Sequence, residues 1–417
     1  MKKVCVIGLG YIGLPTAAIL ASKGFDVSGV DINKEVVKSV NKHKSHISEP
    51  GLDKLLKQVV STEKLHATNK IITADVFIIT VPTPLKENLQ PNISFVEDAV
   101  KQIALKINNG NLILLESTCP VGTTEQIVEL LRQERPDLSL PGDKDSASVV
   151  SIAYCPERVI PGKTLVEIVQ NDRVIGGYTE SCAKIAHTFY KSFVLGKCFI
   201  TNARTAEMAK LTENAFRDVN IAFANEISML CDDLDVDTRE LIELANRHPR
   251  VNILSPGPGV GGHCIAVDPY FLISQCKDNS ILMQAARQVN QKKVDWVMNK
   301  VKTYSEKFTL SSNFTIACFG LAFKADVDDL RESPALEIAK RINSEISCNL
   351  LLVEPNLICL PSDTGLKIEL SDLSYAISSA DLLVLLVDHK EFKLLKPSYF
   401  NNKSILDTRG IWKLDDE

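Results

Sequence analysis

Short apolar, β-branched segments alternate with helical patterns from the N-terminal end of the chain, and this alternation limits the possible folds more than any other feature. Strands that alternate with helices are typical of a parallel, doubly wound α/β sheet. A helix is predicted over Thr179–Phe193, and the polar segment Ser139–Ser148 is predicted to be an inserted loop. The strands predicted in this part of the chain are Val4–Gly8, Val27–Asp31, Val76–Val81, Leu112–Ser117, Val150–Tyr154 and Arg173–Gly176.

The middle of the chain has a different pattern. Thr205–Leu234 is one long helical pattern without glycine or proline, and a second helix is predicted over Asp237–Arg247. Gly257–Gly262 is too rich in glycine and proline to form a regular helix, and helical periodicity resumes over Ile281–Tyr304. The middle therefore predicts a helical region that is interrupted by one glycine-rich loop.

After the polar linker Ser305–Asn313, strands and helices alternate again. Ser333 can cap a helix that has Pro334 in its first position. The strands predicted here are Phe314–Phe319, Leu350–Val353, Leu382–Val387 and Ser404–Leu406. We expect an α/β protein with an N-terminal doubly wound Rossmann-type domain (residues 1–200), a central helical region with one long helix (201–304) and a smaller C-terminal Rossmann-like domain (305–417). The two α/β ends could be a distant repeat, although their sequences do not show one.

Composition limits the kind of protein further. With 417 residues, 45% of them hydrophobic and 24% charged, the chain is long enough for two or three domains of ~150 residues each and is neither disordered nor a coiled coil. A net charge of −5 gives no electrostatic footprint for nucleic acid or an anionic membrane. Apolar runs such as Leu382–Val387 are far shorter than the ~18 residues that a membrane helix needs.

The eleven cysteines and the N-terminus bear on the compartment. The cysteines are odd in number, scattered and without CxxC spacing, so we expect reduced thiols in the cytoplasm and no metal site. Lys2 and Lys3 before an apolar stretch resemble the start of a secretory signal peptide. Gly8, Gly10 and Gly13 would break the helix of such a peptide, so we do not predict one.

The motif GLGYIG, residues 8–13, follows the first predicted strand and opens a helix. In this context its glycines let the backbone approach a pyrophosphate at the helix N-terminus. Asp31 ends the next strand, where it would accept hydrogen bonds from the ribose hydroxyls and repel a 2′-phosphate. The alternative is a tight turn that binds nothing. The motif favours NAD as cofactor, with contacts from Gly8, Gly10, Tyr11, Ile12 and Gly13.

Two later loops carry hydroxyl groups and prolines just after buried strands. They are VPTP, which contains Thr83, and ESTCPVGTT, which contains Thr118 and Cys119. Ligands of doubly wound sheets bind at the carboxyl ends of strands, so these loops could line the nicotinamide half of the cofactor site. Ordinary turn chemistry is the alternative, and Cys119 is predicted to be a packed small residue.

The segment GPGVGGHCIAVDPYF, residues 257–271, can pass close to a ligand because it is rich in glycine. Cys264 follows the paired glycines Gly261 and Gly262, and Asp268 comes four residues later. Most cysteines are small buried hydrophobes. Cys264 is the exception that we single out as a nucleophile, because no predicted helix or strand explains its surroundings.

Polar residues also recur on the long helix. Lys210 and Asn214 are four residues apart and share a face, which Arg217 and Asn225 roughly continue. A solvated polar face would explain this pattern. The functional alternative is a buried ammonium and amide that point at a reacting oxygen.

These parts suit the oxidation of an alcohol to an acid. An alcohol loses a hydride to NAD and a proton to a base. The resulting aldehyde cannot give a hydride until a nucleophile adds to it, and a thiolate such as that of Cys264 would form a thiohemiacetal. A second hydride transfer gives a thioester, which water hydrolyses. A lysine near the thiol would favour the thiolate and stabilise the alkoxide.

Six motifs in this order resemble the nucleotide-sugar 6-dehydrogenases, the family of UDP-glucose and GDP-mannose dehydrogenases. The resemblance runs from about Lys2 to Trp412. The motifs are GLGYIG, ESTCPVGTT, YCPERVIPG, TAEMAKLTENAFRDVNIAFANE, RHPRVNILSPGPGVGGHCIAVDP and GLAFKADVDDLRESPALEI.

The resemblance implies roles for matching residues. It implies that Cys264 is the nucleophile, that Lys210 and Asn214 stabilise the oxyanion, and that Asp268 is the partner of Lys210 and of a catalytic water. It also implies that Glu157 acts in thioester turnover. Thr118 is expected to hold a catalytic water and to contact NAD.

The resemblance also implies binding residues and at least a homodimer, so that a dimer or a higher homo-oligomer is expected. Arg331 is expected to reach NAD, and Arg250, with His248 beside it, to be donated to the site by a neighbouring subunit. The remaining substrate contacts implied are Arg158, Val159, Arg217 and Gly261 for the sugar, and Phe323, Lys324 and Arg409 for UDP. Without the family, Lys324 and Arg331 could equally be surface charges at the ends of a strand and a helix.

The sugar is the least constrained part of the prediction. UDP-glucose enzymes usually carry Pro-Lys-Asp where this chain has Ala266-Val267-Asp268, so the missing lysine disfavours UDP-glucose. The likeness in CIAVDP and RHPRVNIL favours UDP-N-acetyl-D-mannosamine, whose uronate enters surface polysaccharides such as enterobacterial common antigen or capsules. UDP-N-acetyl-D-glucosamine or UDP-glucose is the alternative substrate. A non-catalytic NAD-binding sensor is the alternative class, although it would not need all the catalytic residues.

Overall fold

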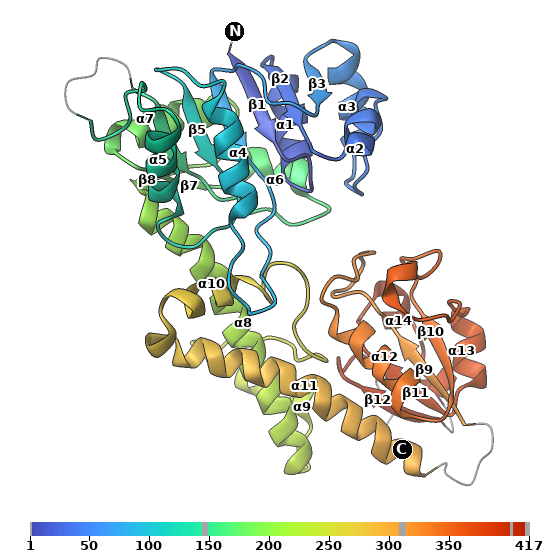
Figure 1. The fold of residues 1–417 in the computed structure, drawn as a ribbon. Coiled ribbons are helices and arrows are strands. Elements are labelled where there is room, and N and C mark those ends of the chain that lie inside the picture. The colour runs from blue at the N-terminus through green and yellow to red at the C-terminus, as the bar shows by residue number, and fades with distance from the viewer. Residues whose placement is uncertain (1, 144–148, 308–313, 401–402, 413–417) are drawn as a thin grey trace. The chain divides into compact units, whose positions relative to one another are not determined.

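The computed structural model describes residues 2–143, 149–307, 314–400 and 403–412 and divides into two compact units. The first unit consists of residues 1–212 and 270–275, and the second consists of residues 213–269 and 276–417 (Figure 1). The predicted inserted loop Ser139–Ser148 and the predicted linker Ser305–Asn313 lie partly outside the described residues. The start of that linker is not a linker, because Ser305 and Glu306 complete the helix before it.

The first unit is built on an eight-stranded sheet in the order β3-β2-β1-β4-β5-β6-β7-β8. All neighbouring strands are parallel except β6 and β7, which pair antiparallel. The strands are β1 (Lys3–Ile7), β2 (Asp26–Val30), β3 (Leu65–Thr68), β4 (Val76–Ile79), β5 (Leu112–Leu115), β6 (Ser151–Tyr154), β7 (Arg173–Gly177) and β8 (Cys198–Asn202).

Helices cover both faces of this sheet. The helices that follow its strands are α1 (Gly13–Ser22), α2 (Lys34–Asn41), α3 (Leu52–Ser61), α4 (Ser94–Ala104), α5 (Thr123–Glu134), α6 (Thr164–Gln170) and α7 (Glu180–Tyr190). One buried cluster joins α1, α3, α6 and α7 to one face, and a second joins α4 and α5 to the other. The doubly wound Rossmann-type prediction is therefore confirmed.

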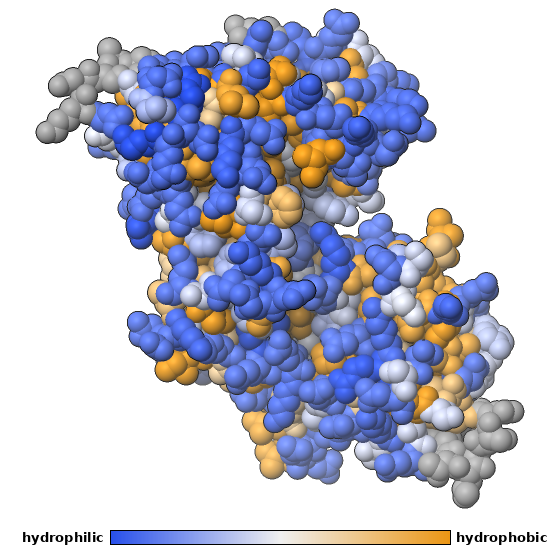
Figure 2. All heavy atoms as spheres, in the orientation of Figure 1, coloured by the Kyte–Doolittle hydropathy of each residue, from blue (hydrophilic) through white to orange (hydrophobic). Residues whose placement is uncertain are grey.

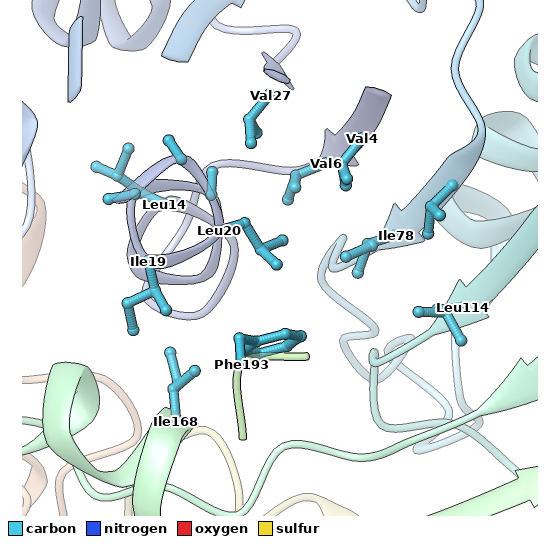
Figure 3. Packing of buried hydrophobic residues seen from close by; sticks show 14 of the residues in the cluster. Val4, Val6, Leu14, Ile19, Leu20, Val27, Ile78, Leu114, Ile168 and Phe193 are labelled. Carbon is cyan, nitrogen blue, oxygen red and sulfur yellow. The ribbon is translucent and has the colours of Figure 1, made fainter. Parts of the chain in front are cut away.

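Alternation of side chains along a buried strand explains the two clusters. On β1, Val4 and Val6 face the first cluster, whereas Cys5 and Ile7 face the second. Figure 3 shows Val4 and Val6 directed toward Leu20 of α1, with Ile78 of the neighbouring strand beside them. Both faces of β1 are apolar, which holds the loop after this strand firmly at the edge of the sheet.

Several predicted elements differ in detail. The predicted strands Val76–Val81 and Leu112–Ser117 end earlier, at Ile79 and Leu115, because the last two residues of each belong to the following loop. Two strands were not predicted: β3 is short and half polar, and β8 is an edge strand with exposed apolar side chains. The helix predicted over Thr179–Phe193 is the shorter α7.

The long central helix is confirmed as α8 (Ala203–Asp233), and it is followed by α9 (Thr238–Ala245). The glycine-rich segment leads into α10 (Asp268–Gln275), which was not predicted, and α11 (Ile281–Glu306) follows. Short 3₁₀ turns lie at Lys277–Asn279, Ser362–Thr364 and Pro397–Phe400. Asp268 therefore opens a helix instead of lying in a loop.

The second unit contains a parallel four-stranded sheet in the order β10-β9-β11-β12. Its elements are β9 (Thr315–Phe319), α12 (Pro334–Glu345), β10 (Asn349–Val353), α13 (Leu373–Ser379), β11 (Leu382–Leu385), α14 (Lys390–Lys393) and β12 (Ser404–Asp407). The Ser333 side chain accepts from the amide of Leu336, and Pro334 begins α12, as the sequence predicts. The smaller Rossmann-like domain is confirmed.

No helix among the described residues is long and apolar enough to cross a membrane. Within the same part of the chain, no disulfide joins any of the cysteines.

Candidate active site

The three glycines of the loop after β1 have different surroundings. Gly8 has φ +93°, and a Cβ there would lie 2.8 Å from the Thr80 carbonyl oxygen. A Cβ on Gly13 would lie 1.8 Å from the Gly8 oxygen, so this glycine lets α1 start against the strand. A Cβ on Gly10 would meet nothing within 4 Å. Gly8 and Gly13 are thus required by packing, and Gly10 leaves open the approach to the amides that begin α1, as a bound pyrophosphate needs.

Asp31 lies directly after β2, beside this loop. Its Oδ2 accepts from the amide of Leu9 at 2.9 Å, and its Oδ1 accepts from the amide of Asn33 at 2.8 Å. Each carboxylate oxygen can accept a further hydrogen bond, so the half-buried carboxylate can also hold two ribose hydroxyls. The residues present therefore fit an NAD.

The loops after β4 and β5 are joined to each other. The Thr83 hydroxyl donates to the Thr118 carbonyl at 2.5 Å, and the Ser117 hydroxyl donates to the Val81 carbonyl at 2.7 Å. The structure therefore brings together the two hydroxyl-bearing loops that the sequence singled out. Cys119 is fully buried, as predicted for a packed residue.

Glu207 anchors the second of these loops and was not predicted. Its fully buried carboxylate accepts from the amide of Gly122 at 2.6 Å, and from the amide and hydroxyl of Thr124 at 2.8 and 2.6 Å. These groups form the start of α5, where a carboxylate stabilises the helix dipole. Because Glu207 lies one turn before Lys210 on α8, it ties the loop of Thr118 to the helix that carries Lys210.

Lys210 is buried and contacts Glu157. Its Nζ donates to the Glu157 carbonyl at 2.9 Å and to Glu157 Oε1 at 3.1 Å, while Glu157 Oε2 accepts from the amide of Val159. Only 6% of Lys210 is exposed. The solvated-face explanation is therefore wrong for Lys210, and the structure pairs it with a carboxylate from the predicted catalytic set.

Besides the Lys210–Glu157 pair, the first unit contains a buried cluster of Glu116, Tyr190 and Arg173. Glu116 is buried and accepts from the Tyr190 hydroxyl at 2.6 Å, with Arg173 Nη1 3.8 Å away and the Arg173 guanidinium over the Tyr190 ring. Burial raises the pKa of the Glu116 carboxyl and raises the pKa of the Cys155 thiol to about 12. The cluster supports the chain just before Thr118 and Glu157. A glutamate at the end of an apolar strand is the only sequence signal for it.

In the second unit, Cys264 lies in a turn that leads into α10. Its carbonyl accepts from the amides of Val267 and Asp268 at 3.0 and 2.8 Å. The Asp268 carboxylate, only 2% exposed, accepts from Asn214 Nδ2 at 2.5 Å. The structure thus brings Asn214 of α8 to the residue that ends the Cys264 turn, which the sequence did not predict.

The glycine-rich segment before Cys264 is packed where a side chain would not fit. A Cβ on Gly261 would lie 2.2 Å from the Glu332 oxygen, and a Cβ on Gly262 would lie 2.7 Å from the Phe323 ring. Gly262 also donates to the Arg331 carbonyl at 3.1 Å. These glycines therefore let the Cys264 turn approach the loop that carries Phe323 and Arg331.

A buried polar network fixes the start of the same segment. Asn225 Oδ1 accepts from the amide of Gly257 at 2.9 Å, and Asn225 Nδ2 donates to Asn290 Oδ1 at 2.9 Å. Asn290 and Arg287 both donate to Asp218 Oδ1, at 2.8 and 2.7 Å, and burial raises the pKa of the Asp218 carboxyl. Asn225 therefore holds the glycine-rich segment in place and is not part of a solvated face.

The predicted UDP contacts lie in the second unit as well. Arg409 donates to Asp388 Oδ1 and, through Nη1, to the Pro256 carbonyl at 3.1 Å. Lys324 is half-buried, and burial together with the charge of Arg217 lowers its pKa. Lys324 is therefore not a fully solvated surface charge, and it lies within electrostatic range of both Arg217 and Cys264.

The other predicted contacts are at the surface of their units. Arg331 is exposed and pairs with Asp329 at 2.5 Å. Arg158 is exposed, and its guanidinium donates to the Asp172 carbonyl at 3.3 Å. His248 and Arg250 are exposed after α9, where the Arg250 amide donates to His248 Nδ1 at 3.3 Å. Among the described residues, no group of three or more His, Cys, Asp or Glu side chains could hold a metal ion.

Three sequence models of one family cover nearly the whole chain. Residues 2–194 match the NAD binding domain of the UDP-glucose/GDP-mannose dehydrogenase family, residues 204–292 match its central domain, and residues 317–414 match its UDP binding domain. The chain belongs to the UDP-glucose/GDP-mannose dehydrogenase family. The predicted resemblance is thereby confirmed, and so are the expected NAD cofactor, the UDP-binding domain and the class of NAD-dependent nucleotide-sugar dehydrogenases.

Members of this family with assigned substrates are similar over their full length. The chain is 52% identical to a UDP-N-acetyl-D-mannosamine dehydrogenase of Yersinia pestis, covering 99% of each chain. It is 50% identical to an NDP-N-acetyl-D-galactosaminuronic acid dehydrogenase of Ralstonia nicotianae, covering 99% of this chain and 96% of the relative. A solved UDP-D-ManNAc dehydrogenase from Pyrococcus horikoshii is 40% identical, with a TM-score of 0.88 and 99% and 96% coverage.

Proposed function

We propose that this chain oxidises UDP-N-acetyl-D-mannosamine at C6 to UDP-N-acetyl-D-mannosaminuronate, in a four-electron reaction. The observation that carries the proposal is the fixed turn of Cys264, which is held by Asp268 and Asn214 on one side and by glycines packed on the UDP-binding domain on the other. NAD supplies the hydride acceptor for both oxidation steps.

The chain's own residues would carry the covalent steps. The Cys264 thiolate adds to the C6 aldehyde and forms a thiohemiacetal, whose oxidation gives a thioester that water cleaves. Lys210 and Asn214, one turn apart on α8, would stabilise the oxyanion of these intermediates. Asp268 and Glu157 would manage the protons of the attacking water, and Thr118 would hold a water at the end of β5. Burial of Lys210 and Asp268 supports these roles, because a buried charge acts in a weakly screening environment.

Binding would be divided between the domains at either end of the chain. In the first, Gly8, Gly10, Tyr11, Ile12, Gly13 and Asp31 would bind NAD, together with Thr83 and Thr118. Arg331 would add a further NAD contact. Phe323, Lys324 and Arg409 would bind UDP, and the sugar contacts would be Arg158, Val159, Arg217 and Gly261. We assign residues 1–200, 201–304 and 305–417 to NAD binding, to dimerisation and catalysis, and to UDP-sugar binding.

A homodimer is part of the proposal. Phe216, Phe223 and Leu230 are exposed at intervals of seven residues along α8, and the exposed Leu234 follows directly after the end of this helix. Such a stripe is typical of a helix that packs on another helix. No residue of α9 is buried, and hydrophobic residues are visible on the surface over α9 in Figure 2. A second copy of the chain would cover this surface and could supply His248 and Arg250 to the substrate.

The substrate and the setting of the reaction follow from the same proposal. Ala266-Val267-Asp268 lacks the lysine of UDP-glucose enzymes, which supports an N-acetylated sugar. UDP-N-acetyl-D-glucosamine, UDP-glucose and the galactosamine derivative suggested by the Ralstonia relative are the competing substrates. We place the enzyme in the cytoplasm, where NAD and UDP-sugars occur, and its product in surface polysaccharides such as enterobacterial common antigen or capsules. An NAD-binding sensor is the alternative of a different class, and membership of a dehydrogenase family disfavours it.

The test is NADH production by the purified protein with each of these UDP-sugars, with NAD and with NADP. We expect UDP-N-acetyl-D-mannosamine to exceed the other sugars by at least ~10-fold in kcat/KM, and two NADH per sugar consumed. NAD should be preferred, because Asp31 would repel the 2′-phosphate of NADP. An equal or higher kcat/KM with another sugar would assign that sugar as the substrate. If no sugar yields NADH, the sensor would be favoured.

A further inference from the structure

Two buried residues that are distant in sequence meet beneath the loop after β9. Glu354 follows β10 and His389 precedes α14, and they are 4% and 0% exposed. Glu354 Oε2 and His389 Nε2 are 3.0 Å apart. Neither residue belongs to the predicted site.

Hydrogen bonds fix the tautomer of His389. The amide of Asp326 donates to His389 Nδ1 at 2.9 Å, and Asn356 Nδ2 lies at the same distance from Nδ1. Nδ1 is therefore the acceptor nitrogen, and the proton lies on Nε2, which donates to Glu354. One imidazole thus links the backbone of residue 326 to the Glu354 carboxylate.

Glu354 holds the other end of the same loop. Its Oε2 accepts from the amides of Leu321 and Ala322 at 2.7 and 3.0 Å, and its Oε1 accepts from the amide of Asn356 at 3.1 Å. Burial alone would raise the pKa of the Glu354 carboxyl, but the hydrogen bonds from His389 and from the amides hold the pKa below its ordinary value. The carboxylate is therefore charged, buried and fully engaged by donors.

The pair encloses a short segment. Its hydrogen bonds reach residues 321 and 322 on one side and residue 326 on the other, so Phe323 and Lys324 lie between the two points of attachment. Asp326 has φ +61°, an unfavourable backbone conformation for a non-glycine residue, and its carboxylate accepts from the amide of Lys390 at 3.0 Å. A strained residue persists where its surroundings over-determine it, as these hydrogen bonds do here.

We propose that Glu354 and His389 are positioning residues for the uridine diphosphate site, because they hold Phe323 and Lys324 in the geometry that binds the nucleotide. The proposal rests on the function proposed above, in which this loop contacts UDP. Loss of the pair would leave Lys324 in the chain but free the segment that carries it. The expected consequence is weaker binding of UDP and of UDP-sugars, with little change in the chemistry or in NAD binding.

Two variants of His389 separate its two hydrogen bonds. His389→Gln keeps a donor near the position of Nε2 and loses the acceptor for the Asp326 amide. His389→Asn keeps an acceptor near the position of Nδ1 and loses the donor to Glu354. Phe392→Leu is the matched control, because its ring packs edge-on against His389 at 5.4 Å but makes no side-chain hydrogen bond to the loop.

The measurements are the calorimetric Kd for UDP, the KM values for UDP-sugar and NAD, kcat, and thermal stability. We expect both His389 variants to raise the UDP Kd and the UDP-sugar KM by ~10-fold or more, with kcat and the NAD KM changed by less than about threefold. Phe392→Leu should lower the melting temperature at least as much as the His389 variants do. Its UDP Kd should stay within about twofold of the wild-type value.

An unchanged UDP Kd in both folded His389 variants, or an equal rise in Phe392→Leu, would overturn the proposal. If the His389 variants do not fold, Glu354→Gln decides it, since it keeps the shape and should still raise the UDP Kd by ~3-fold or more. Failure of the proposed function looks different: the wild type itself would then bind no UDP and produce no NADH.

Discussion

The loops after β1 and β9 share one arrangement. Each begins with a glycine of positive φ whose amide donates at 2.8 Å to the last residue of the next strand, Gly8 to Val30 and Gly320 to Val353. In each loop, a carboxylate directly after that next strand accepts a hydrogen bond from the amide of the residue that follows the glycine. Asp31 accepts from Leu9, and Glu354 accepts from Leu321. The sequences alone show no such repeat.

The two loops differ in the segments after these glycines. After Gly8 the chain enters α1 at Gly13, so backbone amides lie where we propose that the pyrophosphate of NAD binds. After Gly320 it makes a long loop before α12 begins at Pro334, and this loop presents the side chains of Phe323 and Lys324. Asp31 keeps capacity for a ribose, whereas Glu354 is occupied by His389. One local arrangement can therefore bind a nucleotide through its backbone at one end of the chain and through side chains at the other.

Substitutions in the first loop should give the largest effect. Gly13→Ala places a Cβ 1.8 Å from the Gly8 oxygen, so we expect a loss of ~3 kcal/mol or more in the free energy of unfolding and no measurable NAD binding. Gly10→Ala is the matched control for stability. Its Cβ meets no protein atom within 4 Å, so stability should change by less than ~0.5 kcal/mol.

NAD affinity should nevertheless fall by ~10-fold or more in Gly10→Ala, because the methyl group points where the pyrophosphate approaches. Chemical denaturation and calorimetry with NAD measure the two quantities. Unchanged NAD affinity in Gly10→Ala would mean that this loop does not bind the pyrophosphate through its backbone.

A substitution in the second loop should have a smaller and more selective effect. Lys324→Met removes the charge and keeps most of the apolar stem. A hydrogen bond to a charged group contributes about 1.5–3 kcal/mol, so the KM for UDP-sugar should rise by ~10-fold or more while the KM for NAD stays constant. Steady-state kinetics with each substrate varied measures this. Equal rises in both KM values would show that the loop does not act on UDP alone.

The smallest effect that we predict is a difference in pH dependence. Burial and the charge of Arg217 lower the pKa of Lys324 from its ordinary 10.5, so this lysine loses its charge at a lower pH than a solvated lysine does. UDP affinity should therefore fall on the alkaline side, through that lowered pKa. The backbone amides of the first loop do not titrate, so NAD affinity should stay constant over the pH range in which Lys324 loses its charge.

Calorimetric titrations between about pH 7 and 10 measure both affinities. The uracil ring of UDP also titrates in this range, so the effect of Lys324 is the difference between the wild type and Lys324→Met. Identical curves for the two proteins would exclude Lys324 as the titrating group.

The sequence predicted the features that are local in the chain. GLGYIG, the capped start of α12 and the long helix α8 each depend on residues a few positions apart. It did not predict the residues that hold the site from a distance. Glu207 meets Gly122 and Thr124 across more than eighty residues of chain, and Glu354 meets His389 across thirty-five. A single buried carboxylate carries no periodicity that a sequence pattern can reveal.

Two predicted residues have surroundings that the sequence did not indicate. Lys210 contacts Glu157, and Asp268 begins a helix and accepts from Asn214. A polar stripe on a helix is compatible with either solvent or a buried partner, and only the packing of other elements decides between them. The contacts of Lys210 with Glu157 and of Asn214 with Asp268 therefore identify these polar residues as a candidate catalytic set, which the helical pattern alone did not.

The most direct test of the account is uronate formation by purified Cys264→Ala with saturating NAD and UDP-N-acetyl-D-mannosamine. The thiol is small and lies in a turn fixed by backbone hydrogen bonds, so the fold and the Kd values for UDP and NAD should be unchanged. The second oxidation needs the covalent adduct, and uronate output should fall by at least ~10³-fold, roughly 4 kcal/mol of barrier. An output within about tenfold of the wild type, which should make two NADH per sugar, would contradict the thioester mechanism for this protein.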